Sequence, residues 1–233
     1  YAALYGLAAE EIPLRADFSM DVDAFCASRG MRVLANPNAP TGMVLPLSEI
    51  ERILSSDPDR VVLVDEAYVD FGAQTALPLL AKYENLLVVR TYSKSRSMAG
   101  ARLGFALGSE ALIRDLETIR FSTNPYNLNR LTLLLGEAAV ADDAYYMENC
   151  KKIAATRERT TARLKELGFT LAPSQANFLF ASHPAVSGET LYSALKLRGV
   201  LVRHFKKPRI SEYVRITIGT PEQMEVLFAK LFH

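Results

Sequence analysis

The sequence predicts an α/β fold, a mostly parallel sheet with flanking helices, followed by a small α+β unit. Two observations lead to this prediction. Short apolar runs alternate with segments of helical period over roughly the first half of the chain, and the run at 60–65, RVVLVD, is apolar without alternation. Such a continuous run is typical of a strand buried on both faces of a parallel sheet. After residue 126 long helical segments come first, and short strands with two further helices follow.

Each element expected in the first half has a local signal. Apolar runs predict strands at 10–14, 31–36, 60–65, 85–90 and 103–108. Helical periodicity predicts a helix over 47–56, where Ser48 and Glu51 form a capping-box signature. A second helix is expected over 75–83, with Pro78 in its first turn, where proline is tolerated.

The second half predicts a different arrangement. Helices are expected at 127–143, 146–168, 186–199 and 221–232, and strands at 169–173, 176–182, 200–205 and 213–219. The helix that ends at Gly168 is long enough to connect two domains. We therefore expect a large domain over 1–143, a connecting helix over 144–168 and a small domain over 169–233.

Composition excludes several classes of protein. The 233 residues suit one large or two modest domains, and a net charge of +1 offers no electrostatic case for binding nucleic acid or an anionic membrane. No apolar run approaches the length of a bilayer span. Cys26 and Cys150 form no metal or redox motif, so the default location is a reducing cytoplasm. Residues 1–5 read as a helix end stopped by Gly6, which suggests a fragment of a longer chain.

Chemically active side chains follow the apolar strands, where α/β folds place their ligands. Asp65 ends the run at 60–65, and Tyr68 comes three residues later. A carboxylate there is costly to bury unpaired, so it either meets a cation or caps the following helix. Lys94 follows the strand at 85–90. In a partly dry site a lysine loses proton affinity and becomes a nucleophile, whereas in open solvent it is an ordinary loop lysine.

A phosphate cup is the natural reading of the residues around this lysine. Thr91 and Ser93 offer hydroxyls, and Arg102 offers a fork of donors, unless it is simply a surface arginine in a loop. An acid, a phenol, an amine and a phosphate cup together suit pyridoxal phosphate. That cofactor needs a lysine for its aldehyde, a carboxylate at its pyridine nitrogen, a donor at its phenolic oxygen and a phosphate site.

Two arginines in the predicted small domain lie in otherwise apolar strand patterns, Arg203 in VLVRHF and Arg215 in YVRITIG. A charge in such a strand needs a partner. The partner is either an anionic substrate or a carboxylate of the protein itself, such as Glu212 or Asp70. The histidines show no metal-ligand spacing, so no metal site is expected.

Six motifs give the sequence a family resemblance. They are NPNAPTG (36–42), VDEAY (64–68), RTYSKSRSMAGARLG (90–104), QANFLF (175–180), VLVRHF (200–205) and VRITIGT (214–220). In content and order they resemble fold-type I pyridoxal-phosphate aminotransferases, and within them the histidinol-phosphate aminotransferase family. The resemblance implies a ping-pong transaminase for histidinol phosphate with 2-oxoglutarate and glutamate as co-substrates, and a cytoplasmic homodimer.

The resemblance also implies residue roles in cofactor binding. Lys94 would bond to the cofactor aldehyde and then move a proton between substrate Cα and cofactor C4′. Asp65 would keep the pyridine nitrogen protonated, and Tyr68 would hydrogen-bond the phenolic oxygen. The phosphate would be held by Thr91, Ser93 and Arg102.

In the substrate site the same resemblance implies that Arg203 and Arg215 grip the anionic end of the substrate. Asn177 resembles an asparagine near that anion, although a strand-end turn residue is an alternative reading. The family often has asparagine where this chain has Ala39, and Asn38 or Asn36 could replace it. A glycine-containing phosphate turn and an aromatic residue that stacks on the ring are expected upstream of Tyr1.

Other functions share these residues. A threonine-phosphate decarboxylase or an aromatic amino-acid aminotransferase would need the same lysine, aspartate and arginines. A non-catalytic pyridoxal-phosphate sensor domain of a transcription regulator is a third reading. It would not need both substrate arginines.

Overall fold

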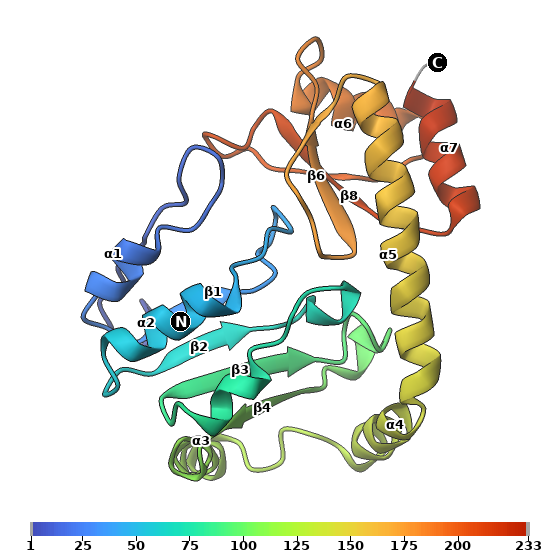
Figure 1. The fold of residues 1–233 in the computed structure, drawn as a ribbon. Coiled ribbons are helices and arrows are strands. Elements are labelled where there is room, and N and C mark those ends of the chain that lie inside the picture. Colours follow the sequence, from blue (N-terminus) through green and yellow to red (C-terminus); the bar gives the residue numbers. More distant parts are fainter. Residues whose placement is uncertain (1, 232–233) are drawn as a thin grey trace.

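The computed structural model describes residues 2–231 and contains two four-stranded sheets joined by one long helix (Figure 1). The first sheet has the order β1 (Arg32–Ala35), β2 (Val62–Asp65), β3 (Leu86–Thr91) and β4 (Gly104–Gly108). The first three strands are parallel, and β4 runs antiparallel to β3. The predicted α/β class with a mostly parallel sheet is confirmed.

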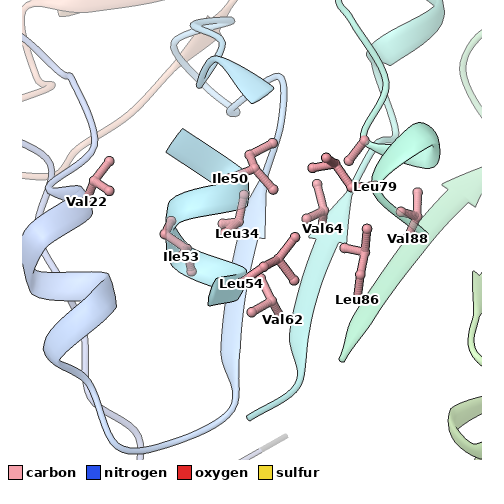
Figure 2. Close-up of a cluster of buried hydrophobic side chains, with 11 residues drawn as sticks. Val22, Leu34, Ile50, Ile53, Leu54, Val62, Val64, Leu79, Leu86 and Val88 are labelled. Carbon is pink, nitrogen blue, oxygen red and sulfur yellow. The ribbon is translucent and has the colours of Figure 1, made fainter. Parts of the chain in front are cut away.

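Apolar side chains from helices and strands form the core that fixes the first sheet. The surrounding helices are α1 (Val22–Ala27), α2 (Leu47–Ser56), α3 (Glu110–Thr123) and α4 (Arg130–Ala141), with short 3₁₀ helices η1 (Val69–Phe71), η2 (Leu77–Ala81) and η3 (Ala99–Ala101). Figure 2 shows side chains of α2 meeting those of β1, β2 and β3. Fully buried members include Ile50, Ile53, Leu54, Val62, Val64, Leu86 and Val88. This packing holds the carboxyl ends of β1–β3 at one edge.

The second sheet is antiparallel, with the order β5 (Thr170–Leu171), β6 (Phe178–Ser182), β8 (Tyr213–Thr217) and β7 (Arg203–His204). Helices α5 (Asp143–Glu166), α6 (Gly188–Leu197) and α7 (Pro221–Leu231) contribute to its core. Buried members are Leu164, Leu179, Ala181, Leu191, Leu195, Val214, Ile216, Ile218, Met224, Leu227 and Phe228. In Figure 1 α5 runs from beside α4 up to α7, so it spans both sheets.

Three local predictions differ from the structure. Residues 10–14 belong to no strand, so that strand prediction is wrong. The capping box is also wrong, because α2 begins at Leu47 directly after Pro46 and makes no side-chain cap bond. Ser48 therefore lies inside the helix. The segment 75–83 forms the 3₁₀ helix η2 over Leu77–Ala81 and not the expected α-helix.

Two helices were not predicted from the sequence, α1 and α3. The α3 helix begins after Ser109, whose side chain accepts a hydrogen bond from the Leu112 amide. None of its residues is fully buried, although Leu112, Leu116 and Ile119 recur at helical spacing. The expected helix end at 1–5 includes residue 1, outside the described residues; the following residues form turns, and Gly6 has a φ of +65°.

Helices α3 and α4 carry about half of the exposed large apolar side chains that the structure describes before residue 144. More than half of the side chain is exposed at Ile119, Phe121, Leu131, Leu133, Leu134 and Leu135. None of the described helices combines the length and apolar character that a bilayer span requires.

Candidate active site

Lys94 and Tyr68 come together at the carboxyl edge of the first sheet. Lys94 lies in the turn after β3, and Tyr68 caps η1 just after β2, the parallel neighbour of β3. Because parallel neighbours end at the same edge, residues 26 positions apart become adjacent. The ammonium Nζ of Lys94 lies 5.3 Å from the centre of the Tyr68 ring. The lysine is exposed and makes no ion pair with any described residue.

Asp65 is the last residue of β2 and is half-buried. Its Oδ1 accepts a hydrogen bond from the Ala67 amide at 3.0 Å, so the carboxylate caps the turn that follows the strand. Within residues 2–231 its second oxygen accepts no hydrogen bond. The capping role and a ligand-binding role are therefore compatible, since each uses a different oxygen.

The hydroxyls of Thr91 and Ser93 lie next to each other at the end of β3. Thr91 donates to Ser93 Oγ at 2.9 Å, and the Ser93 amide donates back to Thr91 Oγ1 at 3.1 Å. Thr91 also pairs in register with Gly104, two residues after Arg102. Arg102 is exposed, has a left-handed φ of +54°, and donates one hydrogen bond to the Ala99 carbonyl at 3.1 Å. The three predicted phosphate contacts thus share one edge.

The two asparagines of NPNAPTG have different roles in the loop after β1. Asn36 is buried, and its amide both accepts from the Leu45 N–H at 2.8 Å and donates to the Leu45 carbonyl at 3.1 Å. Asn38 is half-buried and accepts from the Thr41 hydroxyl at 3.0 Å. Its amide nitrogen donates to no described residue. Asn36 closes the loop, which leaves Asn38 as the donor that could take the place of an asparagine at Ala39.

A buried charge network behind this edge was not predicted from the sequence. Glu66, whose side chain is fully buried, accepts from Arg90 Nε at 3.1 Å and Nη2 at 2.9 Å. It also accepts from the Thr75 hydroxyl and from the Ala76 amide, at 2.6 Å. The usable signal was a glutamate directly after a strand, which must be paired if it is buried.

The network continues from Arg90 to the residue next to the lysine. Arg90 Nη1 lies 3.4 Å from Asp70 Oδ1, and Asp70 Oδ2 accepts from the Ser95 hydroxyl at 2.6 Å. Ser95 is buried and directly follows Lys94. The turn that carries the lysine is therefore tied to β2 and β3 through charged hydrogen bonds.

On the second sheet Arg203 and Arg215 are paired in register across β7 and β8. Like charges placed opposite each other destabilise a sheet unless an anion neutralises them. Neither arginine forms an ion pair in the described part of the chain, and the expected alternatives, Glu212 and Asp70, contact other groups. The Nε of Arg215 is buried without any hydrogen-bond partner. An unsatisfied buried donor is the feature that an anionic ligand would relieve.

The Phe178 ring contacts side chains of both sheets, a role that was not predicted from the sequence. Its centre lies 5.0 Å from that of Tyr68 in an edge-to-face contact, and the Arg215 guanidinium carbon lies 4.9 Å from it. Lys94, Tyr68, Phe178 and Arg215 therefore form a continuous row from the first sheet to the second. Asn177, next to Phe178, accepts from the Ile218 amide through its backbone, and its side chain makes no hydrogen bond with a described residue.

The two histidines that the structure describes, His183 and His204, contact backbone carbonyls. His204 lies 2.8 Å from the Ser211 carbonyl, and His183 lies 3.2 Å from the Leu167 carbonyl. Across residues 2–231 no cluster of histidine, cysteine, aspartate and glutamate has the geometry of a metal site.

The comparisons with known proteins agree on one family. The family model described as "Aminotransferase class I and II" matches residues 1–231. A histidinol-phosphate aminotransferase of Marinomonas sp. (strain MWYL1) is 52% identical over 236 residues, and histidinol-phosphate aminotransferase 2 of Rhizobium meliloti (strain 1021) is 48% identical over 231. Each alignment covers 99% of this chain, and the chain spans 66% of the length of each relative.

The fold is also similar to a solved structure. The histidinol-phosphate aminotransferase of Sinorhizobium meliloti, in complex with pyridoxal-5'-phosphate, superposes with a TM-score of 0.87 at 25% sequence identity. The match covers 99% of this chain and 65% of that one.

Proposed function

Because the chain belongs to the class I and II aminotransferase family, we propose that it carries a pyridoxal-phosphate site and the substrate site beside it. The reaction proposed is transfer of an amino group from histidinol phosphate to 2-oxoglutarate, in two half-reactions. The observation that supports it best is the row Lys94–Tyr68–Phe178–Arg215, which sets a free amine and an unpaired guanidinium on either side of two aromatic rings.

The donor set fits the cofactor. Lys94 is exposed and unpaired within the described residues, and Asp65 keeps one carboxylate oxygen free. The phosphate would be held by Thr91, Ser93 and Arg102, while the Asn38 amide and the Tyr68 hydroxyl would meet the phenolic oxygen. When bound, pyridoxal phosphate supplies the electron sink for deprotonation at substrate Cα.

The protein's own groups would then handle charge and protons. Lys94 Nζ would take the proton from substrate Cα and return it at cofactor C4′, which is general acid–base work. Asp65 would keep the pyridine N–H protonated through its free oxygen. The Glu66–Arg90–Asp70–Ser95 network would hold the backbone on which Lys94 and Asp65 lie, so the geometry is fixed before substrate arrives.

Substrate binding falls to the second sheet. Arg203 and Arg215 would bind the phosphate of histidinol phosphate and, in the second half-reaction, a carboxylate of 2-oxoglutarate, with Asn177 beside them. One anion site serving two substrates is what a two-step transfer through one cofactor needs. The charge of the pair would be neutralised only in the bound state.

Histidinol phosphate is proposed over threonine phosphate or an aromatic amino acid because the curated relatives at 48–52% identity are histidinol-phosphate aminotransferases. A sensor domain is less well supported, since both arginines are available for a turnover substrate. A homodimer is part of the proposal, because exposed apolar residues of α3 and α4 would be covered by a second copy. The cytoplasmic location and the boundaries at 143/144 and 168/169 stay predictions.

The test is a half-reaction panel on the complete protein loaded with pyridoxal phosphate. Histidinol phosphate, phenylalanine and threonine phosphate are added separately, and the visible absorbance of the lysine-bound cofactor is followed. Bleaching by histidinol phosphate, restored by 2-oxoglutarate, supports the proposal. Absence of any response to histidinol phosphate would overturn it.

The lysine assignment has its own control. Lys94→Ala should remove the visible band, with the melting temperature of the cofactor-free protein nearly unchanged, because Lys94 is exposed and forms no ion pair with a described residue. Lys82→Ala, at another exposed lysine, should leave the band intact. A band that persists in Lys94→Ala contradicts the assignment.

A further inference from the structure

Arg157, in the middle of α5, connects the two sheets through a single nitrogen. Its Nη1 donates to the Phe71 carbonyl at 2.8 Å and to the Ala176 carbonyl at 2.9 Å. Its Nε and Nη2 lie 3.1 Å from Oε1 of the neighbouring Glu158. The residue is 5% exposed. Hydrogen bonds from a buried, fully partnered guanidinium are among the strong ones.

The two carbonyls belong to the segments that carry the aromatic bridge. Phe71 closes the 3₁₀ turn η1, which Tyr68 begins. Ala176 lies two residues before Phe178, whose ring meets Tyr68 and Arg215. A group that fixes these two carbonyls relative to each other therefore also fixes Tyr68, on the first-sheet side, relative to Phe178, on the second-sheet side.

The other hydrogen bonds between the two halves in the described part of the chain lie elsewhere. The Gln175 amide donates to the Gly42 carbonyl at 2.9 Å, and Arg209 donates to the Leu14 and Arg15 carbonyls. These contacts hold the loop after β1 and the segment before α1. They do not reach η1, which stays tied to the first sheet through Asp70, so loss of Arg157 would loosen Phe178 and the second sheet relative to Tyr68 while the two sheets stay attached.

We propose that Arg157 is a positioning residue that sets the separation between Lys94 and the arginine pair. The proposal rests on the function proposed above, because that separation matters only if one ligand spans both groups. Effective catalysis requires reacting groups to be held in place, and a misplacement of about 1 Å can cost about 100-fold in rate. Arg157 itself touches neither substrate nor cofactor.

The experiment compares three variants of the complete, cofactor-loaded protein: Arg157→Met, Arg157→Lys and the control Arg159→Met. Arg159 lies on the same helix, is exposed and, among the described residues, donates to the Thr156 hydroxyl alone. Its loss therefore removes the same charge but leaves the hydrogen bonds of Arg157 to the Phe71 and Ala176 carbonyls. For Arg157→Met we expect kcat/KM for histidinol phosphate to fall about 10–100-fold, mainly through kcat. Arg157→Lys should be intermediate, and the control unchanged.

Two further readouts separate positioning from general destabilisation. The dissociation constant of pyridoxal phosphate from the apo-protein should stay unchanged in Arg157→Met, because the cofactor contacts lie on the first sheet alone. Spin labels at Glu110→Cys and Lys196→Cys, with the native cysteines replaced by serine, should show a broader distance distribution in Arg157→Met than in the control.

The outcomes are distinguishable. Unchanged kinetics with a lower melting temperature, or weaker cofactor binding in step with the loss of activity, would overturn the positioning role. If Arg157→Met does not fold, Arg157→Lys carries the same comparison, since lysine keeps the charge but cannot hold both carbonyls in the same geometry. If the wild type does not convert histidinol phosphate, the function proposed above fails. In that case an unchanged distribution of label distances in Arg157→Met would overturn the positioning role of Arg157 as well.

Discussion

The arginine in β3, Arg90, and the arginine pair of β7 and β8 lie in opposite electrostatic surroundings. Arg90 meets Glu66 and Asp70 within the fold, so its charge is neutralised before any ligand arrives. Arg215 faces another arginine across the sheet and keeps a buried Nε without a partner. We infer that Arg90, which is paired within the fold, serves structure, whereas Arg215 is available to an anionic ligand.

The largest effect on stability should come from removing the charged partner of Arg90, the paired arginine. In Glu66→Gln the half-buried Arg90 loses the charge of its fully buried partner, so we expect a loss of about 3–5 kcal/mol in the free energy of unfolding. For a chain of this size that corresponds to a fall of roughly 6–20 °C in melting temperature. Thermal denaturation measures it. Glu110→Gln, which removes a highly exposed partner of Arg114, should cost less than about 1 kcal/mol. Equal effects in the two variants would refute the contrast.

Replacement of Arg215, the unpaired arginine, should weaken substrate binding without loss of stability. In Arg215→Met the KM for histidinol phosphate should rise roughly 10–100-fold, because charge-assisted hydrogen bonds to the substrate anion are lost. The melting temperature should stay the same or rise, since a like-charge neighbour and an unsatisfied buried donor disappear together. Steady-state kinetics and thermal denaturation of the complete protein check both. Arg198→Met, also on the second-sheet side, is the matched control, and a destabilised Arg215→Met would show that the arginine has a structural partner.

Arg203 should show the same behaviour on a smaller scale. It is exposed, so water screens its interaction with an anion. We expect Arg203→Met to raise KM roughly 3–10-fold with no loss of stability. The double variant with Arg215→Met measures their coupling, and strict additivity would mean that the two do not bind one anion.

The smallest expected effect concerns Cys150, whose thiol feels the charge of Asp70 in the buried network. It lies on α5 and is 3% exposed, and burial raises the pKa of its thiol to about 11, with the charge of Asp70 adding to the shift. A raised pKa keeps the thiol protonated at pH 8, so about 100-fold less thiolate is available than for an ordinary cysteine. Mass spectrometry after brief alkylation at pH 8 should find Cys26 modified and Cys150 intact. Rapid modification of Cys150 would mean that α5 does not stay packed beside Asp70.

Much of this arrangement follows from sequence pattern alone. Continuous apolar runs locate β1, β2 and β3 within one or two residues, because a strand buried on both faces has little room for polar side chains. The ends of those strands then place Asp65 and Lys94 at one edge by topology. The strand expected at 10–14 failed because isoleucine and leucine flanking a proline resemble a strand even where no neighbour offers hydrogen bonds.

What the sequence could not predict depends on contacts between distant segments. Phe178 meets Tyr68 across 110 positions, and Arg157 meets Phe71 across 86. Neither contact leaves a periodic or local trace, since both are set by how α5 orients the second sheet. The separate roles of Asn36 and Asn38 were equally hidden, because they depend on which amide faces the Leu45 backbone.

The facing arginines of β7 and β8 also affect how the protein should be handled. Two neighbouring guanidinium groups would take up any small oxyanion, so phosphate or sulfate in a purification buffer would compete with substrate. The same oxyanions would protect the folded chain against heat through mass action. Kinetic constants measured in phosphate and in a zwitterionic buffer would therefore differ, and only the second set would describe the vacant site.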